Sequence, residues 1–171
     1  ISLDMTSDAL HAVVGAESYP DGDNFGRVHV YARTSTANNF AEADILVGSG
    51  VAGGSYFGHS VSLADTGLHL AVGSHAHPTS SGIGRVWIFT RAATTNNFGE
   101  AQTLTGPATN SFFGNRVSIS SNGANLITAA PSMAPTTGTI FVFADQPTIN
   151  TQPTSPTVAG GSPATFTVFA S

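Results

Sequence analysis

The hydrophobic and polar positions of the chain follow a pattern that returns along its length. In the middle of the chain, apolar residues alternate with serine over 60–63, and 68–73 is almost continuously apolar. Alternation with a period of two predicts a half-buried strand, and the continuous run predicts a strand lying deep in a sheet. The segment 85–91, rich in aromatic and β-branched residues, predicts a third strand, and 98–104 predicts a fourth.

This four-strand pattern is a repeat. The segment 26–31 returns as 84–89, and Phe57-Gly58 returns as Phe113-Gly114 at almost the same step along the chain. Each unit is expected to form a four-stranded antiparallel meander, which cannot bury both faces alone and must stack on its neighbours. Because the first unit begins at Ile1 without the Phe-Gly motif, we expect it to lack its first strand and the true N-terminus to lie upstream.

Radial stacking of four-stranded sheets is the β-propeller. The predicted fold is therefore all-β, a partial β-propeller of about three four-stranded antiparallel blades. The recurring phenylalanines predict wedges between blades, and the recurring glycines at Gly15 and Gly73 predict a close approach that leaves no room for a Cβ. The third blade is expected to lose its fourth strand, because Pro147 and its neighbours interrupt the pattern. The predicted boundaries are 1–145 for the propeller segment, divided into blades 1–52, 53–108 and 109–145.

The Phe-Gly motifs, the apolar strands that end near Gly15 and Gly73, and the Gly-x-Val segments at 26–31 and 84–89 resemble the FG-GAP repeats of integrin α-subunit propellers and their bacterial relatives. The resemblance covers roughly 1–145. It implies a fragment of a seven-bladed propeller on a secreted or surface protein, in a family whose members mostly bind or adhere.

The C-terminal segment 146–171 has a different composition. Its Pro/Thr/Ser-rich part at 152–158 and the alternating part at 160–168 resemble a linker and the first strands of a bacterial immunoglobulin-like domain. That fold runs to about 100 residues, so only its opening would be present. A linker that alternates by chance is the alternative.

Composition narrows the function classes. Charged residues make up 9% of the chain, the five basic residues are all arginine, and the net charge is −5, which argues against a nucleic-acid-binding face. The absence of cysteine excludes a disulfide framework and cysteine-based zinc sites. No apolar run approaches the ~20 residues of a transmembrane helix. Together with the resemblance, this composition indicates an extracellular or cell-surface protein.

The calcium sites of the family are not expected in this chain. Calcium requires six to eight oxygen ligands, and the turns at 65–67 and 121–123 are too short and too poor in carboxylates to supply them. The segment 4–8 carries Asp4 and Asp8 without the intervening acidic series. The acidic cluster at 20–24 is interpreted as a solvated turn. No metal or other cofactor is expected.

The repeat allows histidine positions to be compared between units. His11 and His69 occupy one equivalent position, separated by the same step as 26–31 and 84–89, which predicts a solvent-facing site in a strand. His75 and His77 have no counterpart and form a pair that could ligate zinc, but no third ligand is visible, so an exposed loop pair is the prediction. The chain has no Gly-x-Ser-x-Gly elbow, no His-Glu-x-x-His motif and no lysine for a phosphate-binding loop, so an enzyme is not expected.

The loops between strands two and three and between units are long and differ from unit to unit: 17–25, 48–56, 75–83 and 131–137. In a propeller they share one rim, and recognition residues concentrate on such loops. The candidate contact residues are Tyr19, Asp21, Asp23, Tyr56, His75 and His77. We therefore expect a non-enzymatic binding or adhesion module of a large secreted or surface bacterial protein. Its partners would be an unidentified protein or glycan ligand and the remaining blades of the full-length protein. An accessory or catalytic propeller of an extracellular hydrolase is the alternative, and a purely structural element is a third possibility.

Overall fold

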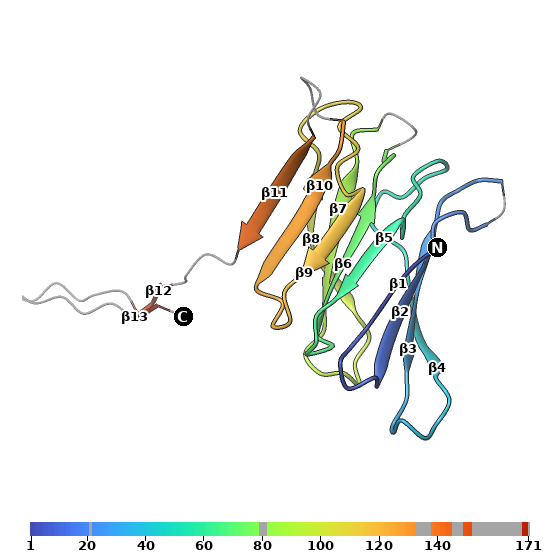
Figure 1. The fold of residues 1–171 in the computed structure, drawn as a ribbon, viewed down its shortest axis with the longest axis vertical. Coiled ribbons are helices and arrows are strands. Elements are labelled where there is room, and N and C mark those ends of the chain that lie inside the picture. The colour runs from blue at the N-terminus through green and yellow to red at the C-terminus, as the bar shows by residue number, and fades with distance from the viewer. Residues whose placement is uncertain (21, 79–81, 133–137, 145–148, 152–168, 171) are drawn as a thin grey trace, which may run out of the picture.

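The computed structural model describes residues 1–20, 22–78, 82–132, 138–144, 149–151 and 169–170, and every regular element in this part of the chain is a β-strand. The all-β prediction is confirmed. Three antiparallel sheets stand side by side like blades, in chain order from blue to orange (Figure 1). A likeness to propeller blades thus holds at the level of the stacked sheets.

The sheets follow the chain. The first has the order β1 (Ser2–Met5), β2 (His11–Ala16), β3 (Arg27–Ala32), β4 (Ala41–Leu46). The second has the order β5 (Ser60–Leu63), β6 (His69–Ser74), β7 (Arg85–Thr90), β8 (Gly99–Thr105). The third has the order β9 (Arg116–Ile119), β10 (Asn125–Ala130), β11 (Thr139–Ala144).

The first sheet corrects the expectation that the first unit lacks its first strand. β1 pairs with β2 along its whole length, from Ser2 opposite Gly15 to Met5 opposite Ala12. The Phe-Gly motif that the first unit lacks is not part of this strand, since in the second sheet β5 begins at Ser60, after the motif has ended. The missing motif therefore carried no information about the strand itself.

The C-terminal part of the chain is described only in pieces. The third sheet has three strands within the described residues, and the segment 145–148, where the pattern was expected to break, lies outside them. β12 (Ile149–Thr151) pairs with β13 (Phe169–Ala170). Because 152–168 also lies outside the described residues, the immunoglobulin-like segment stays a prediction.

Large aromatic side chains fill the spaces between sheets. Phe57 is fully buried, with its ring 5.1 Å from that of Trp87 in an edge-to-face arrangement, in the cluster between the first and second sheets. Phe113 has the same role in the cluster between the second and third sheets, where its ring lies edge-to-face with that of Phe141, at 5.3 Å between centroids. The predicted role of the phenylalanines as wedges between blades is confirmed.

Glycines form the closest contacts between sheets. A Cβ added to Gly15 would come closer than 3.0 Å to the backbone oxygen of Gly58, and a Cβ on Gly73 would come equally close to that of Gly114. Real Cβ atoms do not show such separations, so only glycine permits the backbones of neighbouring sheets to approach this far. The predicted close approach is confirmed at both junctions.

The alternation in β5 has a different meaning from the one predicted. All four of its residues are buried, because the second sheet is covered on both faces. Ser60 Oγ accepts a hydrogen bond from the backbone N–H of Val117 at 2.9 Å, and Ser62 Oγ accepts one from Ile119 at 3.1 Å. The serines therefore join the second sheet to the third rather than facing water.

The recurring histidines are also not solvent-facing. Each ring is half-buried and lies over the turn glycine of the next sheet, His11 over Gly67 and His69 over Gly123. Burial, together with the nearby Arg91, lowers the pKa of His11. The position shared by His11 and His69 is polar, yet it lies in the contact between neighbouring sheets. The sequence of a single unit does not show that contact.

Each outer face of the stack carries exposed apolar side chains. On the first sheet Leu3 is 73% exposed, and on the third sheet Ile140 is 69% exposed. Their counterparts in the second sheet, Val61 and Val86, are buried against neighbouring sheets. Each outer face therefore exposes apolar positions whose equivalents in the second sheet are covered by a neighbouring sheet.

We expect the 171-residue chain to associate through these faces. The two faces are different surfaces of one stack, so contact between them is head-to-tail and continues beyond a dimer. Sedimentation velocity should show concentration-dependent species larger than the monomer, and Ile140→Ser with Val142→Ser, which changes one face only, should reduce them strongly. A monomer at every concentration with a sharp cooperative melt would contradict this expectation.

Candidate functional site

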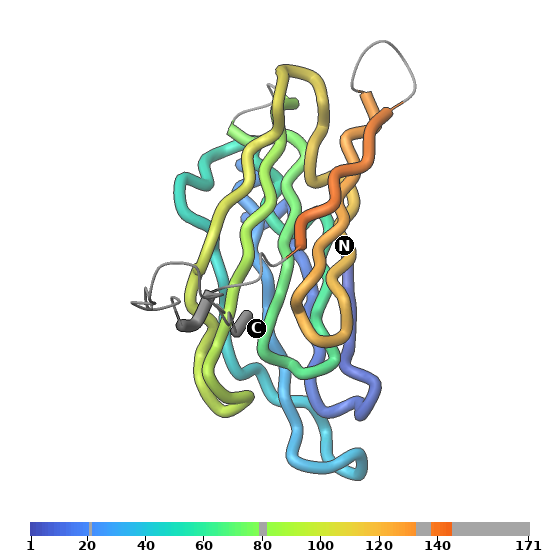
Figure 2. Tube along the Cα trace, turned by 90° about the vertical axis from the view of Figure 1, so that its left-hand side faces the viewer, coloured from blue at the N-terminus to red at the C-terminus, as the bar shows by residue number. Residues whose placement is uncertain are grey.

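The long loops gather at one end of the stack. The connections from β2 to β3, β4 to β5, β6 to β7 and β8 to β9 lie at the upper end in Figure 1, and the short turns lie at the opposite end; Figure 2 shows the same division from the side. We call the upper end the loop rim. Of the loop expected at 131–137, only its first two residues are described.

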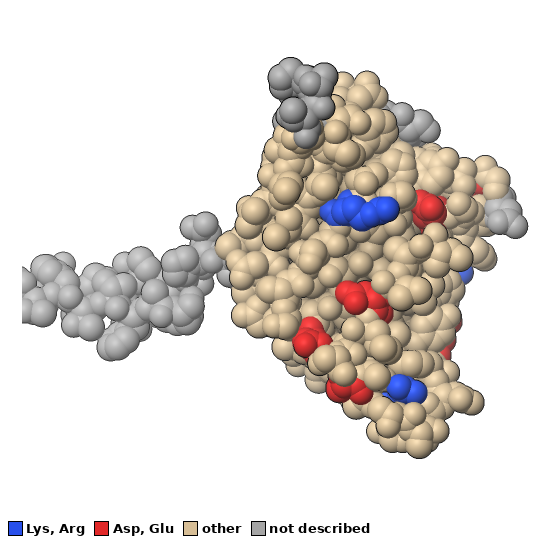
Figure 3. All heavy atoms as spheres, in the orientation of Figure 1, with Lys and Arg blue, Asp and Glu red and all other residues tan. Residues whose placement is uncertain are grey.

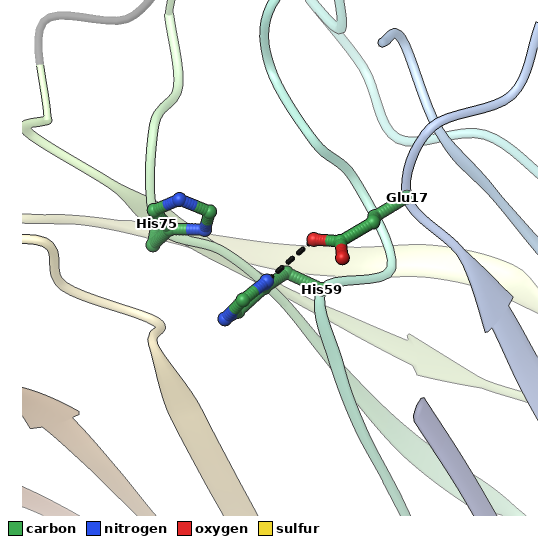
Figure 4. Close-up of side chains that lie close together, drawn as sticks. All are labelled: Glu17, His59 and His75. Atoms are coloured by element: carbon green, nitrogen blue, oxygen red, sulfur yellow. Dashed lines mark hydrogen bonds and ion pairs between the residues drawn. The ribbon is translucent and has the colours of Figure 1, made fainter. Parts of the chain in front are cut away.

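Three side chains of metal-ligand type meet on this rim: Glu17, His59 and His75 (Figure 4). His59 Nδ1 lies 2.5 Å from Glu17 Oε2, and the rings of His59 and His75 have centroids 4.1 Å apart. One potential ligand atom from each of the three lies within 4.8 Å of the other two.

The close contact between glycines places this cluster. Glu17 follows β2 by one residue, His75 follows β6 by one residue, and His59 immediately precedes β5. The approach of Gly15 to Gly58 brings the end of β2 against the start of the second unit, so Glu17 meets His59. His75 reaches the same place from the turn that follows β6 of the second sheet.

Hydrogen bonds assign the proton on His59. Arg116 Nη1 lies 3.3 Å from His59 Nε2, and because a guanidinium can only donate, Nε2 must accept. The ring proton is therefore on Nδ1, where it is donated to Glu17. Burial lowers the pKa of His75, and His59 adds to the shift while Glu17 opposes it, so His75 is a neutral imidazole at neutral pH.

Aromatic side chains surround the cluster. Tyr56 lies 5.5 Å and Phe112 6.1 Å from the ring of His75, centroid to centroid. Both occupy the left-handed region, with φ of 58° and 52°. Their backbone N–H groups donate to loops of the preceding unit, Tyr56 to Asn24 at 2.9 Å and Phe112 to Gly82 at 2.7 Å. These bonds tie neighbouring loops together and explain why the unusual backbone is held.

The predicted contact residues are not all in one place. Tyr56 and His75 lie together, whereas Tyr19 is 44% exposed and stacks on Arg27, whose guanidinium carbon is 3.3 Å from the ring centroid. Asp23 is exposed on the loop from β2 to β3. Asp21 lies outside the described residues.

His77 is not a surface residue, contrary to its prediction as an exposed contact residue. Its side chain is 2% exposed, its Nδ1 lies 3.2 Å from Ser55 Oγ, and its ring packs edge-on 5.2 Å from Trp87. An extended backbone points alternate side chains the same way only in a regular strand, and 75–78 is a turn. His75 and His77 therefore do not form a pair.

Sequence reasoning missed Glu17 and His59. The signal was present in the repeat, because Glu17 and His75 occupy one equivalent position in the first and second units, and His59 corresponds to Asn115 in the third. The loops were selected because their sequences differ between units. A comparison of single equivalent positions next to the strands would also have selected these two residues. Their proximity, however, depends on contacts between sheets.

A hollow of about 540 Å³ lies away from the rim, between the second and third sheets. It is lined by β8 and β11 among others, including Leu104 and Phe143. In the first two sheets a fourth strand pairs with the third, and the hollow lies beside the edge strand β11, which has no such neighbour among the described residues. It therefore reflects the width of the third sheet, not a site.

Comparisons with known proteins bear on the fold. No family model and no curated protein sequence matches the chain. Among solved structures, hydrazine synthase from Kuenenia stuttgartiensis matches with a TM-score of 0.50 at 12% identity, over 84% of this chain and 44% of that chain. The likeness is one of fold. The present chain spans less than half the length of that structure, and the FG-GAP resemblance stays a prediction. The described residues also include no helix of the length and apolarity needed to cross a bilayer.

Proposed function

We propose that this chain is a non-enzymatic binding module, part of a propeller of FG-GAP type in a secreted or surface protein of bacteria, and that it contacts a protein or glycan through the loop rim. The observation that carries the proposal is the convergence of Tyr56, His75 and Phe112 from three separate loops around Glu17 and His59. Aromatic rings held on a rigid scaffold are the usual anchors of recognition surfaces.

Two further features bear on the proposed family and on the class of partner. The residues that carry the FG-GAP resemblance, Phe57-Gly58 and Phe113-Gly114, are those that hold neighbouring sheets together. Charged side chains on the face in Figure 3 are sparse and the basic ones stand apart, which does not favour nucleic acid as the partner.

The hydrolase alternative has less support from the geometry. The serine hydroxyl paired with a histidine, Ser55 with His77, is buried with exposures of 0% and 2%, so a substrate cannot reach it. Among the described residues, the hydrogen bonds of His59 go to Glu17 and Arg116, so His59 does not activate a serine or threonine hydroxyl.

Binding should be tested with the labelled chain on a glycan array and on a panel of purified surface proteins. Tyr19→Ala and Tyr56→Ala are each expected to weaken binding about tenfold or more, as loss of an aromatic anchor does. Tyr31→Ala, which removes the remaining tyrosine on the outer face of the first sheet, is the matched control and should bind normally.

The opposite end supplies the second control. Thr95 is exposed in the turn between β7 and β8, and Thr95→Ala should leave binding unchanged. If Thr95→Ala abolished binding while the two rim variants retained it, the recognition surface would lie at the turns and the proposal would be wrong.

A further inference from the structure

The cluster of Glu17, His59 and His75 contains a buried polar atom without a partner and is open to solvent. The Nδ1 atom of His75 is buried and has no hydrogen-bond partner among the described residues. A buried polar atom without a partner is costly, and it is relieved when a ligand supplies the missing interaction. The Glu17 and His59 side chains are 26% and 21% exposed, so the cluster is reachable from solvent.

The spacing is close to that of a tetrahedral metal site. Ligands of zinc lie about 2.0–2.2 Å from the ion and hence about 3.3 Å from one another. The three potential ligand atoms lie within 4.8 Å of each other, with Glu17 and His59 in direct contact at 2.5 Å. Binding of an ion requires side-chain rotations that open this contact and bring His75 inward.

The donor set also favours Zn²⁺ over Ca²⁺. Two imidazoles and one carboxylate suit Zn²⁺ and leave one tetrahedral position open, whereas Ca²⁺ requires six to eight oxygen ligands.

We propose that Glu17, His59 and His75 form a Zn²⁺ site on the loop rim, with the fourth position open to water or to a donor atom of a bound partner. The metal site itself does not depend on the proposed function; only the role of the open position does.

The contact between Arg116 and His59 gives the proposed zinc site a consequence that can be tested. When Nδ1 of His59 binds the metal, its proton moves to Nε2, which then becomes a donor and can no longer accept from Arg116. Arg116 must turn away, and its positive charge also opposes the incoming cation. Arg116→Gln removes the charge and offers an amide oxygen to accept from Nε2–H, so this variant is expected to bind Zn²⁺ more tightly than the wild type.

The experiment is a calorimetric titration of the tag-free, chelator-treated chain with Zn²⁺, followed by thermal melts. We expect one Zn²⁺ per chain, a higher melting temperature with zinc, and no heat with Ca²⁺. His59→Ala, His75→Ala and Glu17→Ala should each lower the affinity at least about tenfold, and Arg116→Gln should raise it.

His29→Ala is the matched control. His29 Nδ1 lies 2.7 Å from Glu42 Oε2, so it forms a histidine–glutamate pair like that of His59, but it is not part of the three-residue cluster. This variant should bind zinc as the wild type does. The proposal would be overturned if His29→Ala lost as much zinc affinity as the three cluster variants, or if the wild type did not bind zinc.

Cobalt provides a readout that needs no variant. Co²⁺ in a tetrahedral site with two imidazoles should give intense visible absorption that Zn²⁺ removes by displacement. A weak octahedral spectrum would overturn the proposed geometry. Because these titrations use the metal alone, they can succeed or fail independently of any search for a protein or glycan ligand.

Discussion

Gly84→Ala is expected to lower the free energy of unfolding by more than about 4 kcal/mol, the range reached only by severe structural disruption. Gly84 has φ of +80° and forms a parallel bridge with Phe113 of the next unit. An added Cβ would come closer than 3.0 Å to backbone atoms of Phe113, which cannot move aside as a flexible side chain could. The new methyl group therefore pushes the second and third sheets apart.

Substitutions at two other glycines distinguish backbone strain from the steric clash of the added Cβ as causes of the lost stability. Gly22 has φ of +94° and open space around its Cβ position, so Gly22→Ala measures backbone strain alone, about 1–2 kcal/mol. Gly99→Ala would meet nothing nearer than 3.9 Å and should be close to neutral. Chemical denaturation of the three variants gives the comparison. Equal losses at Gly84 and Gly22 would show that the sheets do not need this close contact.

The wild-type protein is expected to lose stability as pH falls from about 6.5 to about 4, and His77→Asn should lose less. Burial, with the positive charge of Arg85 adding to it, lowers the pKa of His77 from 6.5 to about 4. In this window the unfolded chain binds a proton on His77 that the folded protein does not, so acidification favours unfolding. At about 1.4 kcal/mol for each pKa unit, the contribution is at most about 3.5 kcal/mol.

The comparison with His77→Asn isolates this residue. Burial also lowers the pKa values of His11 and His75, and these groups destabilise the protein in the same direction in both chains. Asparagine can still hydrogen-bond Ser55 but carries no charge at low pH. Denaturation at several pH values should show a steeper loss for the wild type, and NMR titration of the His77 ring should show a midpoint near 4. A midpoint near 6.5 would contradict the burial of this side chain.

The repeat made much of the fold predictable. A period of two within strands, glycine-containing turns and constant spacing between motifs predicted all-β sheets, because these patterns are local properties of a single unit. The same spacing predicted the roles of Phe57 and Gly15 at the junctions between sheets. The error on β1 arose because the absence of a motif was taken as the absence of the strand that follows it.

The candidate site was only half predictable. Loop length and divergence selected the rim and, on it, Tyr56 and His75. The same reasoning wrongly predicted that His77 is exposed, because the sequence does not show on which side of a turn the ring lies. Glu17 and His59 stand next to strands, where local patterns give them no special character.

The amino-acid sequence by itself determined the three-unit register, the strand order within each unit and the positions where sheets must meet, since each follows from short-range periodicity or from a residue type that only one geometry needs. Only the tertiary structure decided which polar residues meet across the junctions. Glu17 and His59 are 42 residues apart in the chain, and their contact depends on how closely two backbones approach at Gly15 and Gly58. That approach is a property of stacked sheets, and no single unit contains it.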